Sequence, residues 1–139
     1  MLSDVAVVLR TLQLYYHSCH NIVVGPDFNH DHALFGDFYE EVEDDYDAMI
    51  EESILNEGRN GINLKNQLKQ IYDNIKAIDV MTVDRLVMYR TGIQLEKKLQ
   101  TMLEECKKSN PTLGTETLLG DVAKKCGVRL YKMIATVGS

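Results

Sequence analysis

The stretch His20-Asn-Ile-Val-Val-Gly25-Pro26-Asp-Phe28-Asn-His-Asp-His32 joins two long apolar patterns and decides how the first half of the chain folds. Before it, apolar residues recur at spacings of three and four, at Val5, Val8, Leu12, Tyr16, Cys19 and Val23. After it, a similar pattern runs through Phe28, His32, Phe35, Tyr39, Val42, Tyr46, Met49 and Ser53. This spacing is that of one face of an amphipathic helix, and Gly-Pro ends a helix. The stretch therefore predicts two helices, over residues 3–23 and 28–57.

The second half of the chain carries two more patterns of this kind. The first consists of Met88, Gly92, Leu95, Leu99, Met102 and Cys106; it predicts a helix that opens near Thr82 or Asp84 and stops at Asn110-Pro111. The second consists of Leu119, Val122, Cys126, Leu130, Met133 and Val137, and Thr115 is the expected N-cap of its helix. Four long helices are thus expected.

The connection between the second and third long helices is itself patterned. Gly58-Arg59-Asn60-Gly61 predicts a C-terminal cap and a turn. In residues 63–78 a short amphipathic helix is indicated by Leu64, Leu68, Ile71 and Ile75. A connection this long implies that the second and third long helices run parallel. We therefore predict one all-α domain over residues 1–139, a four-helix bundle whose long crossover carries a short helix, the connectivity of ferritin-like folds.

Charge is distributed unevenly along the chain. Residues 1–58 hold 13 acidic side chains against one basic side chain, whereas residues 59–139 hold 8 acidic against 14 basic. The acidic half would attract divalent cations and repel nucleic acid, and no lysine-rich tail accompanies the helices, so DNA binding is expected to be weak or absent.

No apolar run is long enough to span a membrane, and Met1-Leu-Ser-Asp4 lacks the basic region of a secretory signal, so a cytoplasmic protein is expected. The odd number of cysteines, Cys19, Cys106 and Cys126, favours reduced thiols in the core.

Histidines and carboxylates point to a divided metal site. All four histidines lie between positions 17 and 32, and Asp47 and Glu51 form an i, i+4 carboxylate pair. Imidazole nitrogen together with carboxylate oxygen suits Fe(II), Mn(II) or Zn(II). His32 and the Asp47/Glu51 pair fall on one predicted helix, roughly 22 to 28 Å apart, which is too far for one ion. Two copies related by a twofold axis, with their helices antiparallel, would bring the histidines of one chain to the carboxylates of the other.

Each of these features also has a plain structural interpretation. A run of acidic residues is commonly a solvated helix face. A histidine on an apolar stripe, such as His32, is often a hydrogen-bonded core residue. His20 lies at the edge of the stripe before it, and His17 and His30 are expected to be supporting or incidental residues rather than ligands.

The chain resembles a known family, the Dps-type mini-ferritins (DNA-binding proteins from starved cells). The resemblance lies in His20-Asn-Ile-Val-Val-Gly25-Pro26-Asp-Phe28, in His32, and in Asp47-Ala-Met-Ile-Glu51-Glu52 at matching spacing. A further match, to the start of the last helix of the family, is Thr115-Glu-Thr-Leu-Leu-Gly-Asp-Val-Ala123. The likeness covers most of the chain and is weakest over residues 60–85. It implies an intersubunit ferroxidase centre, with His20 and His32 from one subunit and Asp47 and Glu51 from its twofold partner as catalytic metal ligands.

The chain departs from the family pattern at two positions. The family commonly has an Asp four positions after the second histidine, where this chain has Gly36. Glycine has no ligating side chain; Asp37 is rotated by about 100° from that position, and Glu40 lies one turn further on as a possible substitute ligand. The aromatic residue that usually follows the first histidine is replaced by Asn21.

The resemblance implies a specific function. We expect a homo-oligomeric, dodecameric shell built from twofold dimers that binds Fe(II), oxidises it with hydrogen peroxide or oxygen, and stores Fe(III) mineral, with Zn(II) or Mn(II) as alternative metals at the same site. Two other interpretations stay open. One is a DNA-compacting or scaffold protein of this family whose ferroxidase site is degraded, which Gly36 and the basic second half favour. The other is a plain helical bundle with structural histidines, which predicts a small oligomer.

Overall fold

The computed structural model describes residues 1–138, and each regular element in that range is helical. The α-helices are α1 (Leu2–Ile22), α2 (Phe28–Glu57), α3 (Leu64–Ile75), α4 (Arg85–Lys108) and α5 (Leu113–Val137). A short 3-10 helix, η1 (Arg59–Ile62), follows α2 where the sequence predicted only a turn. The prediction of an all-α chain is confirmed, and the four long helices begin and end within three residues of the predicted bounds.

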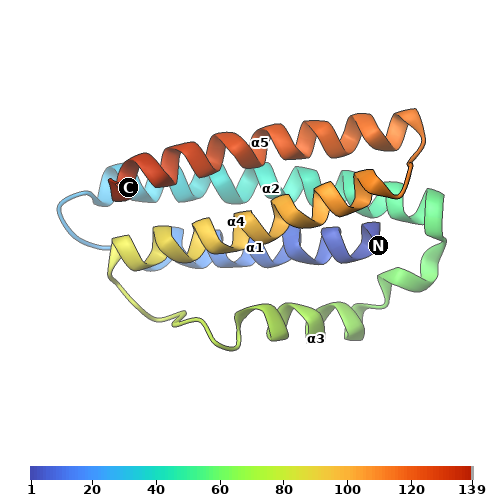
Figure 1. Cartoon of the computed structure of the whole chain (residues 1–139). Coiled ribbons are helices and arrows are strands. Elements are labelled where there is room, and N and C mark those ends of the chain that lie inside the picture. Colours follow the sequence, from blue (N-terminus) through green and yellow to red (C-terminus); the bar gives the residue numbers. More distant parts are fainter. Residues whose placement is uncertain (139) are drawn as a thin grey trace.

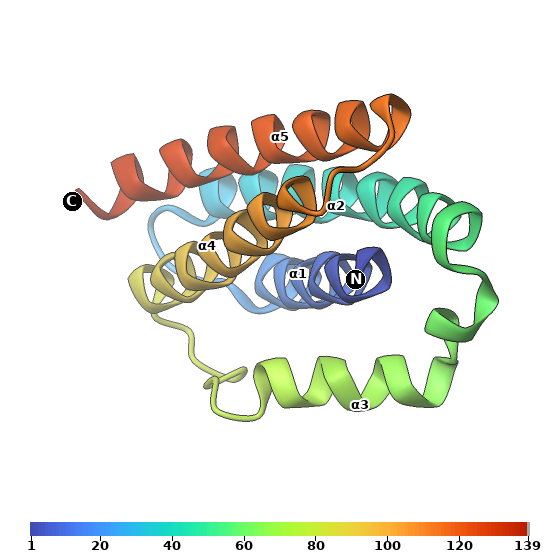
Figure 2. The ribbon, with the colours of Figure 1, turned by 45° about the vertical axis from the view of Figure 1, so that its right-hand side comes forward.

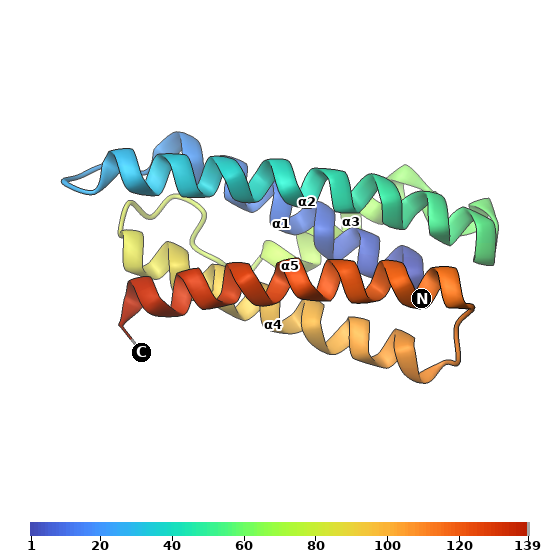
Figure 3. The ribbon, with the colours of Figure 1, turned by 90° about the horizontal axis from the view of Figure 1, so that it is seen from above.

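The four long helices lie side by side along a common direction (Figures 1 and 3). α1 runs antiparallel to α2, and α4 runs in the same direction as α2 because the chain returns through α3 before α4 begins (Figure 1). α3 lies on the side of the molecule away from α5 and packs against α1 (Figures 1 and 2). The turn between α1 and α2 and the start of α4 are therefore at the same end of the molecule.

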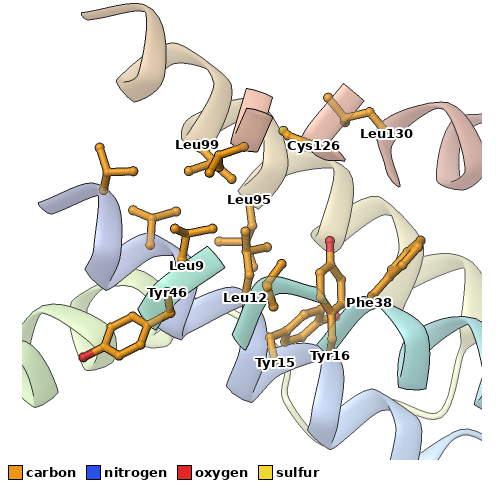
Figure 4. Close-up of a cluster of buried hydrophobic side chains, with 14 of the residues drawn as sticks. Leu9, Leu12, Tyr15, Tyr16, Phe38, Tyr46, Leu95, Leu99, Cys126 and Leu130 are labelled. Atoms are coloured by element: carbon orange, nitrogen blue, oxygen red, sulfur yellow. The ribbon is translucent and has the colours of Figure 1, made fainter. Parts of the chain in front are cut away.

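The apolar stripes meet in one core between the long helices. Leu12, Tyr16, Leu99 and Val122 each have no exposed surface, and Figure 4 shows side chains from this cluster converging from different helices. Burial of such side chains contributes about 1.5 to 3 kcal/mol each relative to exposure. The three cysteines are buried and unpaired, as the sequence predicted.

The helix caps follow the expected chemistry at two positions and depart from it at one. The Asp84 carboxylate accepts a hydrogen bond from the Leu86 amide at 3.0 Å and so caps α4. Gly58 ends α2 with φ +77°, a conformation that favours glycine. The prediction that Thr115 caps α5 is wrong: Thr112 is the N-cap, and its hydroxyl accepts from the Thr115 amide at 3.4 Å. Thr115 lies in the first turn, where its hydroxyl donates to Glu52 Oε1 at 2.7 Å.

None of the helices in residues 1–138 is both long enough and apolar enough to cross a membrane.

Candidate metal-binding site

The turn between α1 and α2 brings His20 and His32 face to face. His20 lies in the last turn of α1 and His32 near the start of α2. Because the two helices are antiparallel and joined by a short segment, the two imidazole rings meet across the turn. Their centroids are 3.7 Å apart and their planes differ by 17°. The structure thus brings together the two histidines that the sequence analysis selected.

Reciprocal hydrogen bonds orient both rings. Nδ1 of His20 lies 2.6 Å from the backbone oxygen of His32, and Nδ1 of His32 lies 2.7 Å from the backbone oxygen of His20. A carbonyl oxygen only accepts hydrogen bonds, so each Nδ1 carries a proton, and in the neutral imidazole each Nε2 keeps a free lone pair. A hydrogen bond from Nδ1–H to a carbonyl is the usual support of a histidine that binds metal through Nε2.

Aromatic side chains surround the pair. The Phe28 ring stacks on His32 with centroids 4.9 Å apart, and the Tyr39 ring meets His20 edge-on at 5.4 Å. His17 also stacks on Tyr39, with ring centroids 4.2 Å apart. His17 is exposed at the surface of α1 and is not hydrogen-bonded to the pair. These contacts limit ring rotation in His20 and His32, so both rings are held before any ligand arrives.

Gly36 lies directly against the His20 ring. A Cβ atom placed on Gly36 would stand 3.1 Å from both Cε1 and Nδ1 of His20, which is tighter than ordinary van der Waals contact. Gly36, which in the sequence is notable as the position of a missing ligand, is therefore in direct contact with the His20 ring in the structure. A side chain at this position would push the ring away by a few tenths of an ångström.

The predicted carboxylate ligands are separated from the histidine pair. Asp47 and Glu51 are exposed on α2, at least 15 residues beyond His32, and Asp37 and Glu40 are exposed as well. Within residues 1–138, no group of three or more histidine, cysteine, aspartate or glutamate side chains is placed to hold a metal ion. One chain thus presents two imidazoles at one place and two carboxylates at another.

Asp31, next to His32, anchors the start of α2. Its side chain is fully buried, and it accepts hydrogen bonds from Arg85 Nε at 2.5 Å, Arg85 Nη2 at 2.8 Å and the Tyr89 hydroxyl at 2.6 Å. Burial alone would raise the pKa of Asp31, but the hydrogen bonds from Arg85 and Tyr89 outweigh it and lower the pKa to about 2. Asp31 therefore stays ionised and ties the helix that carries His32 to the start of α4.

A second buried charge pair fills the centre of the bundle. Arg129 is 1% exposed and donates to both carboxylate oxygens of Glu96, at 2.6 and 3.0 Å. The Tyr16 hydroxyl donates to the same carboxylate at 2.6 Å. The charge of the Glu96 carboxylate is thus compensated by the Arg129 guanidinium. Both carboxylate oxygens are already hydrogen-bonded, so Glu96 is not free to bind a metal inside the bundle.

The sequence analysis missed these buried charges, although a signal for them existed. Asp31 is three residues after Phe28 and four before Phe35, so it occupies a core position of the apolar stripe. Arg129 has the same relation to Cys126 and Met133 on α5. A charged residue at a core position of a stripe needs a buried partner, and that rule would have selected both.

The site offers two kinds of ligand. The histidine end carries imidazole nitrogen donors, and the Asp47/Glu51 end carries carboxylate oxygen donors. Together these donors fit Fe(II), Mn(II) and Zn(II). No protein-family model and no curated protein matches this chain.

Proposed function

We propose that the protein is a mini-ferritin of the Dps type, which oxidises Fe(II) at sites shared between two subunits and stores Fe(III) mineral in a hollow shell. The observation that carries the proposal is the His20–His32 pair, in which both Nδ1 atoms are hydrogen-bonded to backbone and both Nε2 atoms remain available. A pair built only to fill a core would have no need for two free nitrogen donors at a partly exposed position.

A second copy completes the site in this proposal. His32 and Asp47 are separated by about four turns of α2, so one chain supplies either end but not both. With two α2 helices antiparallel about a twofold axis, the histidine end of each chain faces the Asp47/Glu51 end of the other, and two equivalent sites form. The parallel course of α2 and α4, with α3 in the connection, supports the ferritin-like topology that this arrangement needs.

An apolar groove beside α1 supports contact between the copies. It lies between α1, α2 and α3 and is lined in part by Leu14, Leu64 and Leu68, which are 46%, 66% and 54% exposed. Buried among them is the Gln67 side-chain nitrogen, which has no hydrogen-bond partner within the described chain. A second copy seated on this groove would cover the leucines and could supply the missing acceptor.

The division of ligands suggests how the chemistry proceeds. The Asp47 and Glu51 carboxylates offset the charge of a first Fe(II), and the neutral imidazoles of His20 and His32 hold a second, more weakly. Each Fe(II) gives up one electron, and one hydrogen peroxide takes both electrons with two protons, so that its O–O bond breaks to give two water molecules. Because both electrons are taken together at one site, no hydroxyl radical is released.

The test is iron oxidation by the assembled protein. Fe(II) is added anaerobically in small increments, peroxide or air is then admitted, and Fe(III) absorbance and assembly mass are followed together. We expect rapid oxidation with the iron kept in solution by a large assembly. Glu51→Ala should abolish most of the rate, whereas Glu104→Ala, which removes an exposed carboxylate of α4, should leave it unchanged. Unaltered Fe(II) binding and oxidation in Glu51→Ala would refute the proposal.

A further inference from the structure

Gly36 occupies a position in α2 where glycine has no local advantage. It is the ninth residue of a 30-residue helix, and its backbone is not in the positive-φ region that favours glycine. Glycine inside a helix is less favourable than any other residue except proline. The lack of space beside it accounts for a glycine at this position, because a Cβ atom there would be 3.1 Å from two atoms of the His20 ring. By contrast, a Cβ on Gly120 of α5 would meet nothing within 4 Å.

The His20 ring has little freedom to move away from such a Cβ. His32 stacks on it at 3.7 Å, Tyr39 meets it edge-on, and its Nδ1 is bonded to the backbone of His32 at 2.6 Å. A shift of a few tenths of an ångström in the ring would lengthen that hydrogen bond or disturb the stack. The orientation of Nε2 therefore depends on the absence of a side chain at position 36.

We propose that Gly36 is a positioning residue, which holds the His20 imidazole in place and leaves the histidine end of the site without a carboxylate from its own helix. The inference deepens the proposed function, because it takes His20 and His32 as ligands. A site end made of two neutral imidazoles favours cations that accept nitrogen donors, such as Zn(II), over hard cations such as Mg(II). The position thus sets both the geometry and the metal preference of this end.

The first test measures Zn(II) affinity of the assembled protein by calorimetry, in wild type, Gly36→Ala and the matched control Gly120→Ala. Loss of a residue that supports a metal ligand commonly weakens binding about 10-fold to 100-fold, and we expect a loss of that size in Gly36→Ala, close to the loss in His20→Ala. Gly120→Ala should melt at the same temperature as wild type or higher, because alanine favours the helix; in Gly36→Ala the contact with the His20 ring offsets that gain, so its melting temperature should stay close to that of wild type. A structural role alone would not separate Zn(II) affinity from stability in this way.

Gly36→Asp provides a second, opposing test. If position 36 did not seat the ring, an added carboxylate beside the histidines would strengthen Zn(II) binding. If it does seat the ring, the aspartate displaces His20 and Zn(II) binding weakens. Tighter binding in Gly36→Asp, wild-type binding in Gly36→Ala, or no Zn(II) binding by the wild type would each overturn the inference.

These results separate the inference from the proposed function. If the wild type oxidises Fe(II) but Gly36→Ala binds Zn(II) as tightly as the wild type, the role of Gly36 is refuted and the proposed function stands. Zn(II) binding that depends on Gly36, in a protein that oxidises no Fe(II), would remove the proposed function and leave the seating of His20 in place.

Discussion

Arg129 is the largest side chain that is fully buried in the bundle. Its guanidinium compensates Glu96, which has no exposed surface and whose other partner is the Tyr16 hydroxyl. Replacing one member of such a pair leaves an uncompensated buried charge, so Arg129→Met should lower the free energy of unfolding by about 3 to 5 kcal/mol. Denaturant unfolding monitored by circular dichroism measures this.

The matched control for that change is Lys132→Met, which removes an exposed cation from the same helix. Exposed substitutions of this kind change stability by about 0.5 kcal/mol or less. If Arg129→Met were as mild as Lys132→Met, the buried pair would not hold the bundle as described.

The Asp31 carboxylate predicts a pH dependence of stability. Its pKa is about 2 in the folded chain, where burial is outweighed by hydrogen bonds from Arg85 and Tyr89, and about 3.9 when unfolded. Because the folded pKa is the lower one, the stabilisation is complete above the unfolded pKa and is lost as the pH falls toward 2. The stability difference between wild type and Asp31→Asn should be constant above about pH 5 and shrink by about 2 kcal/mol by pH 2. A difference that does not vary with pH would contradict this account of Asp31.

At the residue scale, the sequence predicted which side chains lie together only where a residue type was unusual for its position. The clustering of the histidines predicted that His20 and His32 lie close to each other, and their rings are in contact. Gly36 could be identified only as a departure, because its contact with His20 depends on how two helices pack, and periodicity along one helix does not contain that information. Glu96 and Arg129 lie 33 positions apart, so their pairing was likewise a property of the packed bundle.

Among the elements, the long helices were predictable because each carries an apolar stripe of five turns or more between clear stop signals. Their caps were less so. Thr112 and Thr115 are both good capping residues, three positions apart, and only the structure distinguishes the N-cap from the residue that donates its amide to it. For α3 the stripe predicted the helix, yet only Ile71 of its four members is buried. Periodicity reveals an apolar face and does not reveal what covers it.

The exposed side of α3 gives a prediction for assembly. Leu68 is 54% exposed within one chain, and in the proposed function a second copy covers it. Leu68→Glu should therefore shift the protein to smaller species in light scattering while the unfolding free energy of a single chain changes little. Lys69→Glu, which places a glutamate on the exposed neighbouring position and changes the net charge by even more, serves as the control. An unchanged assembly mass in Leu68→Glu would exclude this face from the contact between copies.

At the scale of the whole molecule, one chain carries the donors of the proposed site without bringing them together. The imidazole nitrogens of His20 and His32 lie at the end where α1 meets α2, and the Asp47 and Glu51 carboxylates lie exposed further along α2. The spacing of His32 from Asp47 and Glu51 along α2, known from the sequence, already excludes one metal ion bound by both sets of side chains within one chain. What the sequence does not contain is the contact between copies, because that depends on two surfaces meeting.

The measurement that tests sharing most directly mixes two inactive variants. One lacks the histidines (His20→Ala with His32→Ala), and the other lacks the carboxylates (Asp47→Ala with Glu51→Ala). Each alone should oxidise Fe(II) no faster than protein-free buffer. Unfolded together in equal amounts and refolded, they form mixed dimers in which one of the two sites regains all of its ligands, so about a quarter of the wild-type rate should return. If the mixture stays as inactive as its parts although mixed dimers are present, the site is not shared between subunits and the proposed function is wrong.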